Sequence, residues 1–447
     1  MKKAIDGSFV WLIATRFVAY LFCLNIAATS TVFAEDAPKQ ITRTQTTSIA
    51  SNPAAVNTTA GTGDLQDFFL KKLKIKNDHG IRFTGAWVGD TNALMAGGIP
   101  NAETWTENSL FLFDMTIDTE KFGAWKGGLF GTQFLQFNGA PTNVQAGSVQ
   151  GYNSLPGPPP LNRSELYQLW YRQVLFHNKL NVRVGKLVPT YDFDNVIKPV
   201  PLSQDKLFIP AVSGLIFTPL FVNPTMLGVM PGYYNSAYGL TTNFTPTKNW
   251  YASYGIFDSN LAQGVQTGLK GLSFNGNYFN VGEIGCDWLV GKEDKPGNVG
   301  VGAWNQSGLI ASGPLTGNDA TGAYLFGSQR LWYKNPDENS SGISMFYQFG
   351  WNNSNVLPMN KYVGAGFTAF GLMPHRQNDS MGLGMALSWL NQQTFTQNTE
   401  LMLQAYYQAQ IMKDIFAEPA ISYIPHPAGG VNIDPTWAGT FRAVLLF

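Results

Sequence analysis

Side-chain character alternates with a period of two along most of this chain, and this constrains the fold more than any other feature. In Met381–Trp389, methionine, leucine and tryptophan alternate with glycine, alanine and serine. Successive side chains of a β-strand point to opposite faces, so such a segment has one apolar wall and one small or polar wall. The last such wall is formed by Phe441, Ala443, Leu445 and Phe447.

About sixteen alternating segments of about ten residues each occur, and these are the number and length typical of a bacterial transmembrane barrel. Their approximate bounds are 80–90, 107–119, 125–137, 165–176, 179–189, 236–245, 249–258, 277–290, 297–307, 321–334, 341–350, 361–372, 380–391, 399–411, 413–424 and 437–447. Closure leaves no unpaired strand edge in hydrocarbon. The sequence therefore predicts an all-β protein, a transmembrane antiparallel β-barrel of about sixteen strands with one or more infolded loops. A secreted β-sandwich or β-helix is disfavoured, because its outer face should be charged.

Composition agrees with a lipid-facing wall. Charged residues are 13% and aromatic residues 14% of the chain, whereas a soluble domain carries about a quarter charged residues. A barrel exposes apolar side chains to lipid and has aromatic belts at both interfaces. Beyond the N-terminal segment no apolar run approaches the length of a membrane helix. Basic and acidic residues number 29 each, so no nucleic-acid partner is expected.

The N-terminus has the pattern of an exported protein. Lys2, Lys3 and Arg16 precede an apolar run, and small residues follow up to Ala34, so residues 1–34 are predicted to be a signal peptide. The remaining predicted parts are a disordered Thr/Ser-rich periplasmic tail (35–62), a short amphipathic helix (63–78) and the transmembrane β-barrel (79–447). This organisation predicts a Gram-negative outer membrane, with lipid and lipopolysaccharide around the barrel. Phe447 is typical of signals read by the insertion machinery.

Catalytic and metal-binding patterns are not found. Only Cys286 survives signal removal, so no disulfide within the chain is expected. The four histidines lack the spacing of a metal site, and no GxSxG elbow occurs. No enzyme activity, catalytic residue, metal or cofactor is therefore predicted. For Asp192 and Asp194 beside Asn195, a solvated turn is favoured over a calcium site.

Two long segments interrupt the alternation. Residues 139–164 are rich in glycine and proline, which predicts an extracellular loop. Residues 189–235 contain seven prolines among apolar residues, and proline cannot donate to a strand ladder. A long apolar loop is not expected to extend into water. We expect this second segment to fold into the lumen and narrow the channel; the alternative is an external cap or an oligomer contact.

Several short motifs follow one another along the chain: Asp78–Ile81 (DHGI), Glu165–Gln173 (ELYQLWYRQ), Arg183–Leu187 (RVGKL) with Asp192 and Phe193, Tyr254–Asp258 (YGIFD), Gly300–Trp304 (GVGAW), Gly371–Gly384 (GLMPHRQNDSMGLG) and Tyr423–Gly430 (YIPHPAGG). In this order they resemble the OprB-type carbohydrate-selective porins of Gram-negative outer membranes, over most of residues 78–447. The resemblance implies a sixteen-stranded barrel that conducts glucose and related sugars. The chain departs from the family at Arg172, where an acidic residue is frequent, and at His375, where glycine is common.

Passage of sugars needs particular side chains in the lumen. Aromatic rings stack on the C–H faces of a sugar, while charged and amide groups hydrogen-bond its hydroxyls. Tyr167, Leu169 and Tyr171 are assigned to the lipid side of their strand, which places the alternate residues in the lumen. Arginine or lysine near the membrane midplane costs about 2–4 kcal/mol on the lipid face, so charges are expected to point inward. The candidate sugar-binding residues are Gln168, Trp170, Arg172, Arg183, Asp114, Asp118, Glu283 and Asp287.

The predicted function is passive, carbohydrate-selective diffusion of small sugars such as glucose, with mono- and small oligosaccharides as the partners. One alternative is a general diffusion porin, and another is a plugged barrel with a structural or adhesive role. The sequence leaves open the preferred sugar and the choice between a monomer and a homo-oligomer such as a trimer.

Overall fold

The computed structural model describes residues 71–72, 80–158, 161–194, 223–227, 229, 236–258, 277–312, 315–336, 341–412 and 414–447. The predicted signal peptide and periplasmic tail lie outside these residues. Of the predicted amphipathic helix, only Lys71 and Lys72 are described, and both are helical. The chain divides into the units Met1–Gln45 and Thr46–Phe447, and every described residue belongs to the second unit.

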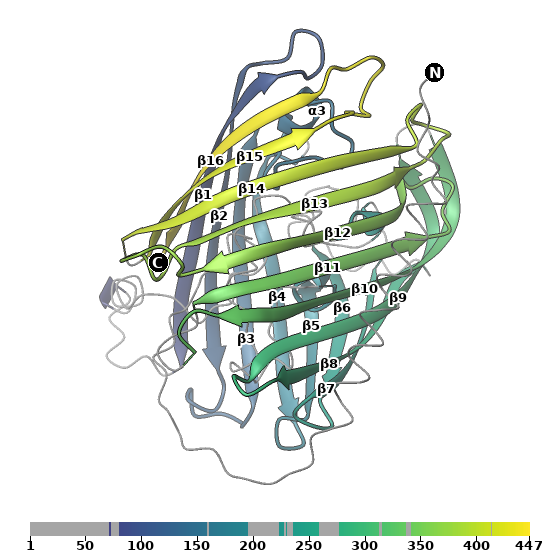
Figure 1. Ribbon diagram of the computed structural model, residues 1–447. Coiled ribbons are helices and arrows are strands. Elements are labelled where there is room, and N and C mark those ends of the chain that lie inside the picture. Colours follow the sequence, from purple (N-terminus) through teal and green to yellow (C-terminus); the bar gives the residue numbers. More distant parts are fainter. Residues whose placement is uncertain are drawn as a thin grey trace. The chain divides into compact units, whose positions relative to one another are not determined.

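In the described part of the chain, sixteen antiparallel strands form a closed barrel (Figure 1). They are β1 (Ile81–Ala96), β2 (Trp105–Asp118), β3 (Gly128–Gly139), β4 (Arg163–Leu175), β5 (Leu180–Leu187), β6 (Ala237–Phe244), β7 (Trp250–Asp258), β8 (Tyr278–Val290), β9 (Lys295–Ser312), β10 (Leu315–Tyr333), β11 (Gly342–Asn352), β12 (Met359–Phe370), β13 (Ser380–Leu390), β14 (Thr399–Met412), β15 (Ile415–Ile424) and β16 (Thr436–Leu446). Each strand pairs with its neighbours in sequence, and β1 pairs with β16. This confirms the predicted all-β barrel.

The helices of the described residues are short: α3 (Thr142–Gln145), η2 (Pro189–Tyr191) and η6 (Pro224–Met226). No helix in the described ranges has the length and apolar character needed to cross a bilayer. Strands β9 and β10 reach well beyond the segments predicted for them, and Leu315 pairs with Ser312 close to the tip of their hairpin. The extension lacks the apolar alternation of the other strands, which explains why the sequence pattern does not reveal it.

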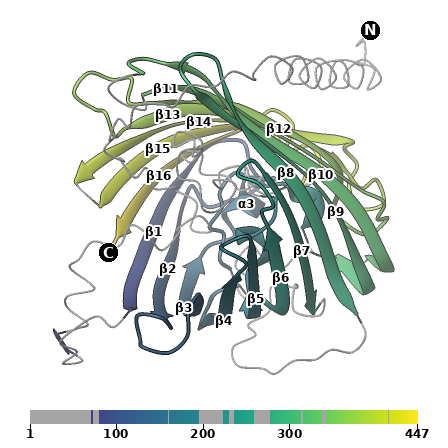
Figure 2. The ribbon, with the colours of Figure 1, turned by 90° about the horizontal axis from the view of Figure 1, so that it is seen from below.

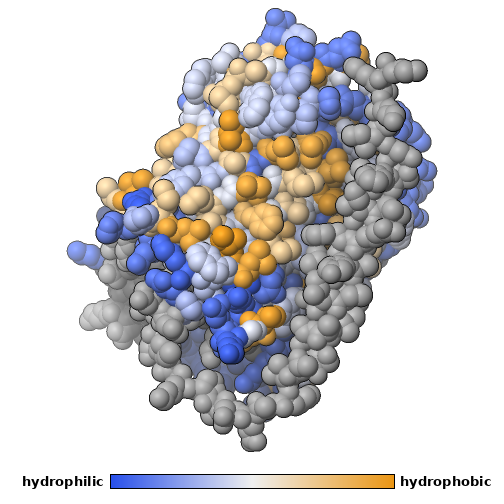
Figure 3. All heavy atoms as spheres, in the orientation of Figure 1, coloured by the Kyte–Doolittle hydropathy of each residue, from blue (hydrophilic) through white to orange (hydrophobic). Residues whose placement is uncertain are grey.

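The alternation in sequence becomes two faces of the barrel wall. In β13 the outward Leu383 is 60% exposed, whereas the inward Ala386 and Ser388 are buried. Figure 3 shows hydrophobic residues gathered over the middle of the face formed by β11–β14, with hydrophilic residues toward its ends. This is the distribution expected of a wall that contacts hydrocarbon.

Aromatic side chains cluster at two rims of the outer wall. Near the β2–β3 turn, Trp125, Phe130 and Tyr171 lie with ring centroids 4.8–6.2 Å apart. On the opposite rim, Tyr423 of β15 stacks on Trp437 of β16 at 4.3 Å. Such amphipathic rings are typical of the girdles of transmembrane barrels at the membrane interfaces.

The final residue lies along the seam that closes the barrel. The amide N–H of Gly85 in β1 donates to the carbonyl of Phe447 at 2.7 Å, and the Phe447 amide donates back to Gly85 at 3.1 Å. A Cβ at Gly85 would lie 2.2 Å from the Phe447 ring, so a larger residue at this position would displace the ring. The same ring stacks on Phe111 of β2 at 5.9 Å.

The described part of the segment between β3 and β4 folds into the barrel, and its predicted extracellular side stays a prediction. Figure 2 shows α3 inside the ring of strands. Gln150 Nε2 donates to the carbonyl of Ala386 at 3.2 Å, and Ser388 Oγ donates to Gln150 Oε1 at 2.8 Å. These partners lie more than 230 residues away along the chain. Glycine and proline content indicates a loop but does not tell on which side of the wall it lies.

The described parts of the proline-rich segment 189–235 also contact the inner wall. Asn223 Nδ2 donates to the carbonyl of Phe349 in β11 at 2.9 Å. Asn352 Nδ2 donates to the carbonyl of Thr225 at 2.8 Å, and both Asn223 and Thr225 are fully buried. Residues 195–222, 228 and 230–235 lie outside the described part, so narrowing of the channel by the whole segment stays a prediction.

Candidate functional site

A ladder of polar side chains crosses the inner faces of β2, β3 and β4. Asp114, Gln133 and Gln168 are register partners on adjacent strands. Gln133 Nε2 donates to Asp114 Oδ1 at 2.8 Å, and Gln168 Nε2 donates to Gln133 Oε1 at 2.7 Å. Among the described residues, Asp114 Oδ2 and Gln168 Oε1 have no hydrogen-bond partner. Both predicted residues therefore lie on the inner face of the wall, and these two oxygens are buried.

Trp170, Arg172 and Arg183 come together on β4 and β5. Arg172 and Arg183 are register partners, and the Arg183 guanidinium carbon lies 5.5 Å from the centroid of the Trp170 ring. Directly opposed like charges on neighbouring strands destabilise a sheet, and an ion pair between Arg183 and Asp192 offsets this repulsion. The Nε atoms of both arginines have no hydrogen-bond partner within the described ranges. The cluster thus combines an aromatic face with two guanidinium groups.

Tyr167 does not lie on the lipid side as its parity predicts. It is 2% exposed and belongs to a buried apolar cluster with Leu135, Phe137 and Leu155. The cause is a register shift between β3 and β4 at Gln133 and Phe134, because a bulge resets the alternation of the strand beyond it.

Asp118 lies at the end of β2 and caps the following turn. Its Oδ1 accepts hydrogen bonds from the backbone N–H groups of Glu120 at 3.0 Å and Lys121 at 3.2 Å. An aspartate that bonds the backbone two residues on is the ordinary stabiliser of a turn. This predicted site residue therefore has a local structural role in the turn.

Glu283 and Asp287 share the inner face of β8, in agreement with their predicted parity. Glu283 accepts hydrogen bonds from the hydroxyls of Tyr251 and Tyr324 and from the backbone N–H of Asp194, each at 2.7 Å. The bond to Asp194 holds the residues that follow η2 against the inner wall. Asp287 is 3% exposed, and in the described ranges neither carboxylate oxygen has a hydrogen-bond partner.

The prediction of a solvated turn is wrong for Asp194, which is only 1% exposed. Its Oδ2 accepts a hydrogen bond from the backbone of Asn223 at 3.2 Å. Burial raises the pKa of Asp194 well above its ordinary value, and the nearby Glu283 carboxylate raises it further. Among the described residues, no group of three His, Cys, Asp or Glu side chains is placed to hold a metal ion.

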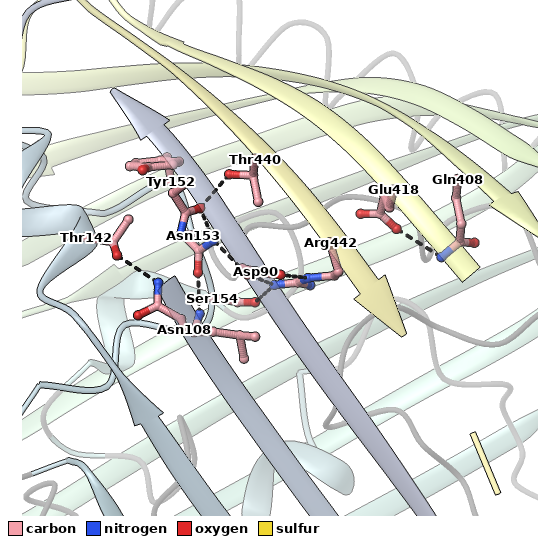
Figure 4. A network of polar contacts seen from close by, with 12 residues as sticks. Asp90, Asn108, Thr142, Tyr152, Asn153, Ser154, Gln408, Glu418, Thr440 and Arg442 are labelled. Atoms are coloured by element: carbon pink, nitrogen blue, oxygen red, sulfur yellow. Dashed lines mark hydrogen bonds and ion pairs between the residues drawn. The ribbon is translucent and has the colours of Figure 1, made fainter. Parts of the chain in front are cut away.

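A second polar network joins β1, β16 and the infolded loop (Figure 4). Asp90 of β1 pairs with Arg442 of β16, and Asn153 Nδ2 donates to Asp90 Oδ2 at 2.8 Å and to Asn92 Oδ1 at 2.9 Å. Thr440 Oγ1 donates to the same Asn92 oxygen at 2.7 Å. The sequence reasoning missed these residues, although Asp90 and Arg442 are charged residues within otherwise uncharged stretches of predicted strands.

Comparisons with known proteins agree with this geometry. Residues 102–445 match a family model described as "Carbohydrate-selective porin, OprB family". Porin B of Pseudomonas aeruginosa is 22% identical over 403 residues, covering 80% of this chain and 85% of that protein. The high-pH structure of Pseudomonas putida OprB superposes with a TM-score of 0.71 at 18% identity, covering 85% of this chain and 97% of that chain. The low-pH structure of the same protein gives a TM-score of 0.54 at 16% identity, with 86% and 97% covered.

Proposed function

The chain belongs to the OprB family of carbohydrate-selective porins, and from this we infer that it lets small sugars such as glucose diffuse passively through the lumen of its barrel. The lumen-facing cluster of Trp170, Arg172 and Arg183 is the observation that carries the proposal at the level of residues. It places an indole face next to two guanidinium groups.

This chemistry suits a sugar. A C–H face of a pyranose ring can lie on the Trp170 indole, while Arg172 and Arg183 donate to its hydroxyls. The Asp114–Gln133–Gln168 ladder on the adjoining strands offers further acceptors. Binding must be weak enough for the solute to leave, so a few exchangeable hydrogen bonds are preferable to an enclosed site.

The family and the barrel place the protein in an outer membrane. We propose that residues 1–34 direct its export in a Gram-negative cell, that the insertion machinery reads the strand ending in Phe447, and that lipid and lipopolysaccharide contact the outer wall. The apolar outer residues of β13 and the aromatic rims support this arrangement. The choice between monomer and homo-oligomer is left to measurement.

A plugged barrel is the second candidate, because the loop between β3 and β4 crosses from its own strands to β13. Reconstitution into liposomes separates the two. We expect swelling in glucose to exceed swelling in an uncharged amino acid of similar size, and the Trp170→Ala/Arg172→Ala variant to lose this preference. A Trp351→Ala/Arg376→Ala variant is the matched control, since Trp351 is 46% exposed on the outer wall and Arg376 lies in a turn. Absence of swelling with every solute would favour the plugged barrel.

A further inference from the structure

Glu400 of β14 binds two loops at once. Its carboxylate Oε1 accepts from Ser148 Oγ at 2.7 Å and from the backbone N–H of Gln150 at 2.9 Å. Oε2 accepts from the backbone N–H groups of Val149 at 3.0 Å and Ala428 at 2.9 Å. The first three donors belong to the infolded loop between β3 and β4, and the fourth to the loop between β15 and β16. The carboxylate therefore has two donors on each oxygen.

The backbone of the infolded loop is shaped to present these donors. Gly147 and Gly151 flank the three residues, with φ angles of +70° and +83°, in the left-handed region that favours glycine. A Cβ at Gly147 would lie 2.6 Å from the Ile433 side chain. The Gly429 amide donates to the Gly147 carbonyl at 2.8 Å, so the two loops also bond to each other.

The carboxylate and the loop depend on each other energetically. Glu400 is fully buried, and no cation of the described residues forms an ion pair with it. A buried charge is tolerated only when hydrogen bonds or an opposite charge replace its hydration. Here the hydrogen bonds come from loop donors, which would in turn be left unsatisfied without the carboxylate.

The same loop has a second attachment. Gln150 bonds within the wall to the carbonyls of Ala386 and Glu400. Further along the loop, Asn153 bonds to Asp90 at 2.8 Å and Arg442 bonds to Ser154 at 2.9 Å. The loop is thus held at β13 and β14 and again at β1 and β16, and Glu400 provides the charged contact at the first of these places.

We propose that Glu400 is a positioning residue that holds the β3–β4 loop in the lumen and so sets the size limit for solutes. This rests on the proposed function as a diffusion channel. Glu400 acts through the loop rather than by contact with the sugar. Release of its contacts would let residues 148–150 leave the wall and widen the passage.

The near-isosteric change Glu400→Gln is a sharp test. An amide has one acceptor oxygen and one NH₂ donor. Whichever way the amide is turned, its NH₂ group faces at least one backbone N–H, either that of Gln150 or those of Val149 and Ala428. The volume is kept while the hydrogen-bond pattern becomes repulsive. The matched control is Glu418→Gln, which removes a fully buried carboxylate on the neighbouring strand β15 that accepts from Gln408 within the wall at 3.0 Å.

The measurements are single-channel conductance in planar bilayers and liposome swelling with glucose, sucrose and raffinose. We expect Glu400→Gln to raise the conductance and the swelling rate in raffinose relative to glucose, while Glu418→Gln matches the wild type. A correctly folded Glu400→Gln barrel with wild-type conductance and the wild-type ratio of swelling rates would overturn the proposal. So would equal effects of the two variants, because the lost charge would then explain the change.

A milder variant covers the case in which Glu400→Gln does not fold. Ser148→Ala removes one donor to Oε1 from the loop side and leaves the carboxylate in place. We expect it to raise the conductance by less than Glu400→Gln does; a folded Ser148→Ala barrel with wild-type conductance would contradict the proposal. If the wild type shows no sugar preference while Glu400→Gln still widens the pore, the proposed function fails and the role of Glu400 stands.

Discussion

Asp90 of β1 and Arg442 of β16 form a buried ion pair at the seam where the barrel closes. Arg442 Nε donates to Asp90 Oδ1 and Nη2 donates to Oδ2, each at 2.7 Å, and both side chains are fully buried. Nη2 also donates to Ser154 Oγ at 2.9 Å, which ties the infolded loop to the seam. The pair therefore links closure of the barrel to the position of the loop.

Arg442→Met removes this guanidinium and leaves Asp90 with one donor among the described residues, the Asn153 amide at 2.8 Å. Removing one partner of a buried pair destabilises by about 3–5 kcal/mol, because the other charge stays buried without compensation. We expect the free energy of unfolding to fall by about this amount. Adding Asp90→Asn removes the stranded charge, and the double variant should regain much of the loss.

The assay is urea-dependent folding into phosphatidylcholine vesicles, followed by tryptophan fluorescence. The control is Arg376→Met in the β12–β13 turn, where Arg376 Nε lies 2.7 Å from Asp379 Oδ2 but the arginine side chain is 42% exposed. Solvent screens this pair, so its loss should matter much less. The reasoning is refuted if both arginine variants lose equal stability, or if Asp90→Asn does not rescue Arg442→Met.

Two further predictions use the same unfolding assay. Leu383→Arg places a charge on the lipid-facing wall and should lower the free energy of unfolding by about 2–4 kcal/mol. Val431→Arg in an exposed loop is the control and should leave the free energy of unfolding unchanged. Equal stability of the two variants would contradict the assigned outer face. Burial raises the folded-state pKa of Asp194. Above a pH of about 4, the folded state therefore keeps a proton that the unfolded state has lost. As a result, the free energy of unfolding falls as the pH rises toward the folded-state pKa. Asp194→Asn should therefore lose less stability than the wild type as the pH rises above about 4, and an identical pH dependence would count against this carboxyl.

The strands could be predicted because alternation is a local signal. Each residue of β13 reveals its face through its two neighbours in sequence, and the same holds along β8, where Glu283 and Asp287 lie inward as predicted. The contact between Trp170 and Arg183 also follows from parity, since β4 and β5 are joined by a tight turn that fixes their register.

The remaining features depend on contacts that no local pattern records. Gln150 and Ser388 are 238 residues apart, so the infolding of the β3–β4 loop is decided by complementarity across the lumen. The buried position of Tyr167 follows from a bulge, and one extra residue in a strand leaves little trace in composition. Glu400 stands among alternating residues like any other inward side chain, and its four donors become apparent only when two distant loops meet.

Sugar-selective diffusion through this lumen is tested most directly by the swelling rates of liposomes that contain the purified wild-type barrel. Glucose and an uncharged amino acid of similar size are compared at equal osmolarity, with protein-free liposomes as the baseline. The account predicts faster swelling in glucose, and loss of that difference when Trp170 and Arg172 are both replaced by alanine. Equal rates for the two solutes in the wild type would contradict it.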